Sequence, residues 1–490
     1  MNSPERLSDA LAAFSDLRLY IDGQWTSGAT GVNEPVVNPA DGRTLGRLPH
    51  AATADLDRAL GAAARTFPAW SMVPAAERRR ILLEASRLLR ERSARLALIL
   101  TLEQGKPLAE AQAEVGAAIE VFEWYAEETR RLYGRTIPPR AIGVSQVVEH
   151  YPVGPVAAFT PWNFPALTPA RKIAGALAAG CTLVIKPAEE TPATAIELAR
   201  ACADAGVPPG VLNVVFGVPQ EVSDFLLRSP VIRKMTFTGS IPVGRHLARL
   251  AAEHGLKRCT LELGGHAPVL VCDDADVELA ARTCAAGRFR NAGQVCVAPS
   301  RFYVQAGVYD DFAVAMSRAA AGLRVGDGLD PQTTMGPLAN ARRLEAVQRY
   351  VEDAQASGGE VRTGGGRPDG AGYFFEPTVV TGLRDSALAM REETFGPVAP
   401  LVKFDTIDEA VARANSLSFG LAAYGFTRSA LTAAHLSRHL SAGMVGINHL
   451  AVSLAEAPFG GVHESGYGSE GGSEGLQAYL APKFISHLLS

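Results

Sequence analysis

Hydrophobic residues recur every three or four positions through much of residues 53–131, which is the spacing of a single buried helix face. Asp55, Pro74 and Lys106-Pro107 mark helix starts within this stretch, so we predict several long helices. Basic runs such as Arg78-Arg79-Arg80 are expected on a solvated helix face. The apolar positions that form the buried face are Ile81, Leu82, Ala85, Leu88, Leu89, Leu96 and Leu100.

After Pro155 the pattern changes to short apolar runs that alternate with helical segments. Strands are predicted at 156–160, 182–186, 211–216, 234–237 and 258–261, and helices at 167–179 and 192–205. Such alternation is typical of a parallel sheet with helices on both faces. A second series of strands and helices extends from Pro268 to about Gly446. The extended segments 141–151 and 477–488 are predicted to be edge strands that need cover.

The composition limits the classes of protein to which this chain can belong. Its 490 residues are 47% hydrophobic, which is enough for two or three domains with large cores. A net charge of −4 with scattered charges argues against a nucleic-acid surface, and no run of about eighteen apolar residues could span a membrane. The N-terminal residues show no secretory pattern. Six cysteines without CxxC pairs and ten scattered histidines predict a reduced, cytoplasmic protein without a metal site.

Two residues indicate covalent chemistry. Cys296 follows the small-residue loop 290–295, and Glu262 lies in the glycine-bearing segment 261–266. A thiolate is a good nucleophile, and an ordinary cysteine with a pKa of about 8.5 is already slightly ionised at neutral pH. A nearby carboxylate could act as a base. Taken alone, however, a single cysteine is more often buried and inert.

A glycine-bearing turn is a candidate for phosphate binding. No GxGxxG motif follows a predicted strand, but the segment 239–244 lies between a strand and a helix. A helix N-terminus offers unpaired backbone N–H groups and a positive dipole end to a pyrophosphate. Taken alone, this signal is weak and a plain turn is the better interpretation.

Five segments in one order carry a family resemblance. They are Thr160-Pro161-Trp162-Asn163-Phe164-Pro165, Lys186-Pro187-Ala188-Glu189, Phe237-Thr238-Gly239-Ser240, the Cys296 loop and Glu393-Thr394-Phe395-Gly396-Pro397. In this order and spacing, the chain resembles NAD(P)-dependent aldehyde dehydrogenases from about Leu19 to Phe484. The resemblance implies an α/β, aldehyde dehydrogenase-like fold and a homodimer or homotetramer. The implied parts are a Rossmann-type cofactor domain at 1–133 and 153–262, an α/β catalytic domain at 263–465, and a small β oligomerisation arm at 134–152 and 466–490.

The resemblance also implies a role for each candidate residue. Cys296 attacks the aldehyde carbonyl, the Asn163 amide and the Cys296 N–H stabilise the oxyanion, and Glu262 activates the water that hydrolyses the thioester. NAD is the implied cofactor, with NADP possible. Glu189 favours NAD, because a carboxylate that accepts from a ribose 2′-OH would repel a 2′-phosphate. The residues implied in cofactor binding are Thr160, Trp162, Lys186, Glu189, Gly239, Ser240, Glu393 and Phe395.

Two arginines narrow the implied substrate. Arg171 and Arg290, with Ser453, match positions at which succinate-semialdehyde dehydrogenases hold a distal carboxylate. Guanidinium groups bind carboxylates in a bidentate manner. The resemblance therefore implies oxidation of succinate semialdehyde to succinate, with 2-oxoglutaric or glutarate semialdehyde as alternatives. The competing interpretation is that each arginine forms a salt bridge within the protein.

Other classes of function use the same residues differently. A CoA-acylating thiol acyltransferase or a cysteine hydrolase would keep the thiol, and a non-catalytic structural protein could keep the fold. Glu262 disfavours the acylating enzyme, which needs no base to activate water. Cys296, Asn163 and Glu393 disfavour a structural protein. His463 stands where the family usually has lysine, outside the catalytic set.

Overall fold

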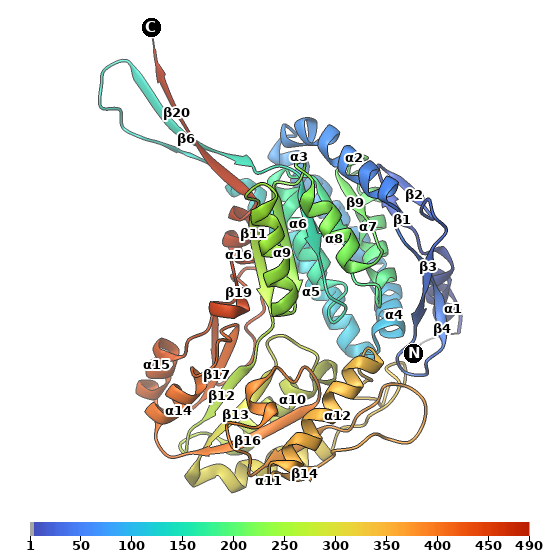
Figure 1. Cartoon of the computed structure of the whole chain (residues 1–490). Helices are drawn as coiled ribbons and strands as arrows, with labels where there is room; N and C mark the ends of the chain where they lie inside the picture. Colours follow the sequence, from blue (N-terminus) through green and yellow to red (C-terminus); the bar gives the residue numbers. More distant parts are fainter. Residues whose placement is uncertain (1–3, 490) are drawn as a thin grey trace.

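The computed structural model describes residues 4–489, which form two α/β bodies and a projecting arm (Figure 1). The first body is built on an eight-stranded sheet. Five neighbouring strands, β11, β10, β7, β8 and β9, are parallel, as the apolar runs predicted, and β1, β2 and β19 extend the sheet in antiparallel pairing. In sheet order the strands are β19 (Gly466–Tyr467), β11 (Arg258–Leu263), β10 (Lys234–Gly239), β7 (Val156–Phe159), β8 (Leu183–Lys186), β9 (Leu212–Val214), β1 (Leu19–Ile21) and β2 (Gln24–Thr26).

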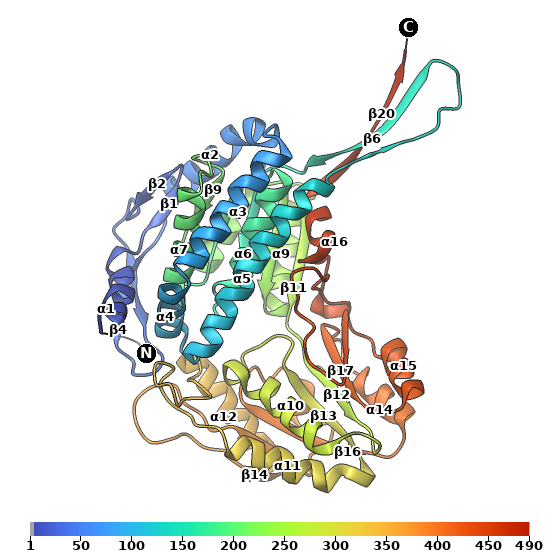
Figure 2. The same ribbon diagram turned by 180° about the vertical axis from the view of Figure 1, so that it is seen from behind.

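Helices cover both faces of this sheet. On one face α6 and α7 lie beneath α3, α4 and α5, while α2, α8 and α9 cover the other (Figures 1 and 2). Because α6 lies between the sheet and the outer helices, all of its residues but the first are buried. The bounds are α2 (Thr53–Ser71), α3 (Ala75–Glu91), α4 (Ser93–Gln104), α5 (Leu108–Glu128), α6 (Leu167–Ala179), α7 (Pro192–Asp204), α8 (Pro219–Arg228) and α9 (Ile241–Glu253).

One residue of the arginine-rich run in α3 corrects the expectation of a solvated face. Arg78 is 7% exposed, and its guanidinium donates hydrogen bonds to the backbone oxygens of Ala178 (3.0 Å) and Val73 (2.5 Å). Ala178 lies in the last turn of α6, where carbonyl groups have no partner within the helix. Arg78 is therefore buried because its guanidinium binds one backbone carbonyl at the end of α6 and one just before α3. Arg79 and Arg80 lie nearer the surface.

The second body contains a seven-stranded sheet. All of its pairings are parallel except that of β14 with β15. Its strands in sheet order are β14 (Glu360–Thr363), β15 (Thr378–Thr381), β16 (Val398–Phe404), β13 (Pro299–Gln305), β12 (Ala267–Val271), β17 (Ala422–Phe426) and β18 (Met444–Ile447). Its helices are α10 (Val277–Phe289), α11 (Tyr309–Ala321), α12 (Ala341–Ala356), α13 (Leu388–Arg391), α14 (Ile407–Ala414) and α15 (Ala430–His439).

The arm is a three-stranded sheet that projects from the first body in both views (Figures 1 and 2). Its strands are β5 (Arg135–Thr136), β6 (Val144–Pro152) and β20 (Leu480–Leu488). β6 and β20 pair along their whole length, so the two predicted edge strands cover each other. β19 pairs with β11 and α16 (Gly472–Gln477) packs on α6, so both elements belong to the first body. The C-terminal strand of the arm therefore begins at Leu480.

Two smaller elements complete the first body, namely α1 (Pro4–Ala12) and the hairpin of β3 (Asn33–Val37) with β4 (Thr44–Pro49). Within residues 4–489, no helix combines the length and the apolar character that crossing a membrane requires.

Candidate active site

A cavity of about 570 Å³ lies where the two bodies meet, and it brings together residues that are far apart in the sequence. Asn163 follows β7, Glu262 lies on β11, Cys296 precedes β13 and Glu393 follows α13. All four line this cavity. The residues predicted for nucleophile, base, oxyanion donor and cofactor contact therefore share one site.

The backbone before Cys296 makes a sharp left-handed turn. Asn291, Ala292 and Gly293 have φ values of 50°, 51° and 75°, a region that residues other than glycine rarely adopt. At Gly293 a Cβ atom would lie 2.3 Å from the oxygen of Gly396, so no side chain fits there. Two consecutive non-glycine residues in this region need support from their surroundings. The turn leaves Cys296 at the wall of the cavity.

The Cys296 thiol lies against the Glu262 carboxylate. Burial, the charge of Glu262 and a hydrogen bond to that carboxylate raise the pKa of Cys296 well above its ordinary value. Burial and the neighbouring carboxylate of Glu470 raise the pKa of Glu262 to about 7. An ordinary cysteine is slightly ionised at neutral pH, whereas these surroundings favour the neutral thiol. Cys296 must lose its proton before it can attack, and Glu262 is placed to accept it.

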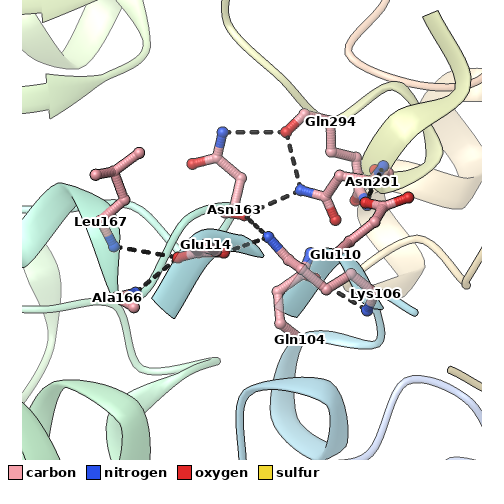
Figure 3. Close-up of polar contacts among 9 residues, drawn as sticks. All are labelled: Gln104, Lys106, Glu110, Glu114, Asn163, Ala166, Leu167, Asn291 and Gln294. Carbon is pink, nitrogen blue, oxygen red and sulfur yellow. Dashed lines mark hydrogen bonds and ion pairs between the residues drawn. The ribbon is translucent and has the colours of Figure 1, made fainter. Parts of the chain in front are cut away.

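The side chain of Asn163 donates one of its two amide hydrogens to a hydrogen bond within the protein. Its Nδ2 donates to the backbone oxygen of Gln294 at 3.1 Å, and the side chain is 5% exposed (Figure 3). An amide carries two hydrogens, so a second donor remains. Among residues 4–489, the N–H of Cys296 makes no hydrogen bond. Two unused donors on one cavity are the arrangement that stabilises an oxyanion.

The turn after β10 provides a helix N-terminus on the same cavity. Gly239 ends β10 and Ser240 is the N-cap of α9, and both line the cavity. The Ser240 side chain makes no capping hydrogen bond, so the first-turn N–H groups of this thirteen-residue helix stay available. A Cβ atom at Gly239 would lie 2.4 Å from the Phe237 ring, which explains the need for glycine. This arrangement fits a pyrophosphate.

Three further predicted cofactor residues lie at the carboxyl ends of β7 and β8, outside the walls of the main cavity. Lys186 forms an ion pair with Glu189. Thr160 donates its backbone N–H to the Lys186 oxygen (3.2 Å), and its buried hydroxyl has no partner within residues 4–489. The carboxyl ends of parallel strands are the usual ligand site of open α/β sheets. The polar set here fits an adenosine ribose.

Glu393 and Phe395 also line the cavity. The N–H of Gly265 donates to Glu393 Oε1 at 3.0 Å, and burial raises the pKa of Glu393 to about 7. Phe395 has a φ of 40° and packs edge to face with Trp162, with 5.6 Å between the ring centroids. The carboxylate and the two rings fit the ribose and the flat ring of a nicotinamide.

The predicted substrate residues Arg171, Arg290 and Ser453 also line the cavity. Arg171 donates to Ser453 Oγ at 2.8 Å and lies 4.2 Å above the centroid of the Phe459 ring. The Arg171 side chain is buried, and its Nε has no partner in the described chain. Arg290 lies 5.6 Å above the centroid of the Phe164 ring. Neither arginine forms an ion pair with any residue from 4 to 489, so no internal salt bridge accounts for them.

Comparison with known proteins identifies the family. Residues 25–485 match the Aldehyde dehydrogenase family. The chain belongs to this family. It is 49% identical over 470 residues to the 4-(hydroxymethyl)benzenesulfonate dehydrogenase TsaD1 of Comamonas testosteroni, which covers 96% of this chain and 98% of that protein. It is also 44% identical over 465 residues to the NADP(+) succinate-semialdehyde dehydrogenase GabD of Escherichia coli (strain K12), covering 95% and 96%.

Solved structures support the same assignment. The succinate-semialdehyde dehydrogenase from Burkholderia pseudomallei matches this fold with a TM-score of 0.95 at 43% identity, covering 100% of this chain and 99% of that one. The predicted family and aldehyde dehydrogenase fold are therefore confirmed.

This aldehyde dehydrogenase has site residues that the sequence did not single out. Lys172 donates to Thr238 Oγ1 (2.9 Å) and pairs with Glu470, whose charge acts on Glu262. The only sequence signal was that Lys172 follows Arg171 directly. Among the residues described, no group of three or more His, Cys, Asp or Glu side chains is arranged to hold a metal ion.

Proposed function

We propose that this protein oxidises an aldehyde that carries an anionic group at its far end, with NAD(P) as the cofactor. The observation that supports the proposal is that Arg171 and Arg290 line the cavity of Cys296 and have no carboxylate partner in the described chain. Arg171 is buried and Arg290 is exposed. A guanidinium buried without a counter-ion is unfavourable, so an anionic substrate is the natural partner of Arg171, and Arg290 adds a second positive charge at the same cavity. Succinate semialdehyde is the first candidate, with glutarate and 2-oxoglutaric semialdehydes as alternatives.

A sulfonate is the second candidate for the distal anion. The relative at 49% identity is named for a benzenesulfonate substrate. Ser453 accepts a hydrogen bond from Arg171, which leaves its own hydroxyl hydrogen for donation. Together with Arg290, these side chains offer donors for the three oxygens of a sulfonate as well as the two of a carboxylate. The Phe164 and Phe459 rings, which also line the cavity, would pack against an aromatic substrate.

The chemistry follows from the residues around Cys296. Glu262 takes the thiol proton, and Sγ attacks the carbonyl carbon of the aldehyde. The Asn163 amide and the Cys296 N–H donate to the oxygen that gains negative charge, and loss of one such donor costs about 10²–10³ in rate. When bound, the cofactor supplies a hydride acceptor. After Glu262 has released its proton, it deprotonates the water that hydrolyses the Cys296 thioester, and the acid leaves.

Separate parts of the site would hold the cofactor. Ser240 and the first turn of α9 would bind its pyrophosphate, and Lys186 with Glu189 would bind the adenosine ribose. Thr160, Trp162 and Gly239 border this path, and Glu393 with Phe395 would hold the nicotinamide ribose and ring.

The test is a substrate panel on wild type, Arg171→Ala and Arg290→Ala, followed by NADH absorbance. Truncation of one partner of a buried charge pair costs about 2–5 kcal/mol, or roughly 30- to several-thousand-fold in kcat/KM. For Arg171→Ala we expect this loss with succinate semialdehyde and 4-sulfobenzaldehyde and little change with butanal. The exposed Arg290 should give a smaller loss with the same dependence on substrate. Arg87→Ala is the matched control, because Arg87 pairs only with Glu84 and Glu91 on the surface of α3.

Each outcome of the panel has a defined meaning. A higher kcat/KM for one of the two anionic substrates selects carboxylate or sulfonate as the distal group. A wild-type preference for butanal, or an equal loss for all substrates, would contradict the anion-binding proposal. A strict requirement for CoA would favour the acylating transferase instead.

A further inference from the structure

Lys106 is a buried cation whose amino group points toward the catalytic loops. It lies in the turn between α4 and α5 and is 1% exposed. Nζ donates to Glu114 Oε2 at 2.6 Å and to the backbone oxygen of Asn163 at 2.8 Å (Figure 3). It also lies 4.1 Å from the centroid of the Phe164 ring. A carboxylate, a carbonyl and a ring face surround this ammonium group, so its position is fixed.

Glu114 extends the same contact to the start of α6. Its Oε1 accepts the backbone N–H groups of Ala166 (2.8 Å) and Leu167 (3.2 Å). Ala166 is the N-cap of α6 and has no side-chain oxygen, so Glu114 satisfies donors that the local sequence leaves free. The Lys106–Glu114 pair therefore holds the segment from Asn163 to Leu167 at both ends. Its polar atoms have partners, which a buried ion pair requires.

The nucleophile loop is attached to the same group of residues. Asn291 Nδ2 donates to the Asn163 oxygen (2.9 Å) and to the Gln294 oxygen (3.3 Å), which also accepts from the Asn163 amide. The N–H of Asn291 donates to Glu110 Oε2 at 2.8 Å. The turn before α5 thus holds the Asn163 loop through Lys106, and the first turn of α5 holds the loop before Cys296 through Glu110 (Figure 3).

We propose that Lys106 is a positioning residue that acts on the reaction through Asn163. By fixing the Asn163 peptide, it orients the side-chain amide so that one hydrogen bonds Gln294 and the other faces the oxyanion. The inference rests on the proposed function, in which Asn163 is an oxyanion donor. A donor must lie about 2.7–3.1 Å from the oxyanion. A displacement of about 1 Å can cost about 10²-fold in rate.

Direct binding of the substrate's distal anion is the competing role, because Lys106 also borders the cavity. The two roles differ in their dependence on substrate. A lysine that bound the anion would matter only for anionic aldehydes. A lysine that positions Asn163 affects every carbonyl substrate, because each one forms the same oxyanion.

The test is Lys106→Met, which removes the charge and the donor but keeps a long unbranched side chain. We expect the single-turnover rate of NADH formation to fall about 10²-fold with both succinate semialdehyde and butanal, with KM for NAD unchanged. Acylation of Cys296 by 4-nitrophenyl acetate without NAD should slow as well. In an Asn163→Ala background, Lys106→Met should cause no further loss, since both changes act through one donor.

Lys257→Met is the matched control for loss of a buried lysine. Lys257 is 7% exposed and donates to the backbone oxygens of Ser229 (3.0 Å) and His254 (2.5 Å), and none of these residues lines the cavity, so its loss should leave the acylation rate of folded enzyme unchanged. If Lys106→Met does not fold, Asn291→Gly provides the second variant. Glycine keeps the left-handed backbone at φ 50° and removes the side-chain donor to the Asn163 and Gln294 oxygens, so acylation should again slow for both aldehydes.

Three results would overturn the inference. They are an unchanged acylation rate, a loss confined to anionic aldehydes, and full additivity with Asn163→Ala. A wild-type enzyme that neither aldehyde nor ester can acylate would instead refute the proposed function itself, so the two failures can be distinguished.

Discussion

Glu262 is a carboxyl group whose pKa, at about 7, lies within the working range of the enzyme. Its hydrogen bond with the Cys296 thiol lowers that pKa, and acylation of the thiol removes the bond. Acylation therefore removes one interaction that lowers the pKa of Glu262. Because the base must be deprotonated, hydrolysis-limited kcat should rise as pH increases through about 7 and level off above about 8.

Two variants control this pH prediction. Glu262→Gln should lose turnover and the rising limb, and its single equivalent of NADH should form more slowly than in wild type, because Glu262 also accepts the thiol proton. Cys296→Ala should release no NADH. A kcat that stays flat between about pH 6 and 8 in wild type would remove Glu262 from its role as base.

We expect Glu189 to control the choice between NAD and NADP. A carboxylate at the adenosine ribose repels a 2′-phosphate, so kcat/KM with NAD should exceed that with NADP by at least about tenfold, or ~1.4 kcal/mol. Glu189→Gln should lower the ratio of kcat/KM with NAD to kcat/KM with NADP. The control is Glu190→Gln at the neighbouring residue, which pairs with Arg342, and it should leave this ratio unchanged. Equal efficiencies in wild type would mean that Glu189 does not face the ribose.

Residues of the site differ in how far the sequence reveals them. Cys296 and Glu262 are candidates by residue type, but their roles and that of Asn163 could be assigned only because five motifs occur in the order of the family. Lys106 could not, because its partner Asn163 is 57 positions away and Lys106-Pro107 indicated only a helix start. Contacts between loops distant in sequence depend on the tertiary fold. The raised pKa of Cys296 also depends on burial, which the motif does not specify.

At the scale of elements, α7 begins with a cap supplied by another helix. Glu103, near the end of α4, accepts the N–H groups of Ala193 (2.8 Å) and Thr194 (2.9 Å), while the N-cap Thr191 makes no side-chain cap. Glu103→Ala would leave these buried donors without partners, and the free energy of unfolding should fall by about 1–3 kcal/mol. Urea unfolding against the control Glu91→Ala, an exposed glutamate of α3, measures this. An equal effect of both changes would exclude the capping role.

The central elements of the first sheet could be predicted because each is one continuous apolar run. Strands β7 to β11 and helices α6 and α7 are formed by residues that are buried almost throughout. The added strand β19 could not be predicted, because its residue Tyr467 pairs with Leu261, which lies far away in the sequence. Burial of Arg78 was missed for the same reason, since its acceptor lies on α6.

At the scale of the whole molecule, the arm exposes large apolar side chains. Phe484 and Leu488 on β20 are 56% and 72% exposed. Exposed apolar residues on a projecting sheet are typical of an interaction surface, so we expect a homodimer or homotetramer formed through the arm. Sedimentation velocity should show Phe484→Ser shifted toward smaller species and the neighbouring Lys483→Ser unchanged. A monomeric wild type would contradict this expectation.

The pairing of Lys172 with Glu470 has a consequence for how the protein is made. The two residues are 298 positions apart, and Glu470 influences the base Glu262. A ribosome that adds about 5–20 residues per second needs about 15–60 s to cover that interval. During this time Lys172 is without its carboxylate and β11 without its neighbour β19. The surroundings of the base are therefore completed only after residue 470 has been made, and products that stop before Glu470 lack the partner of Lys172.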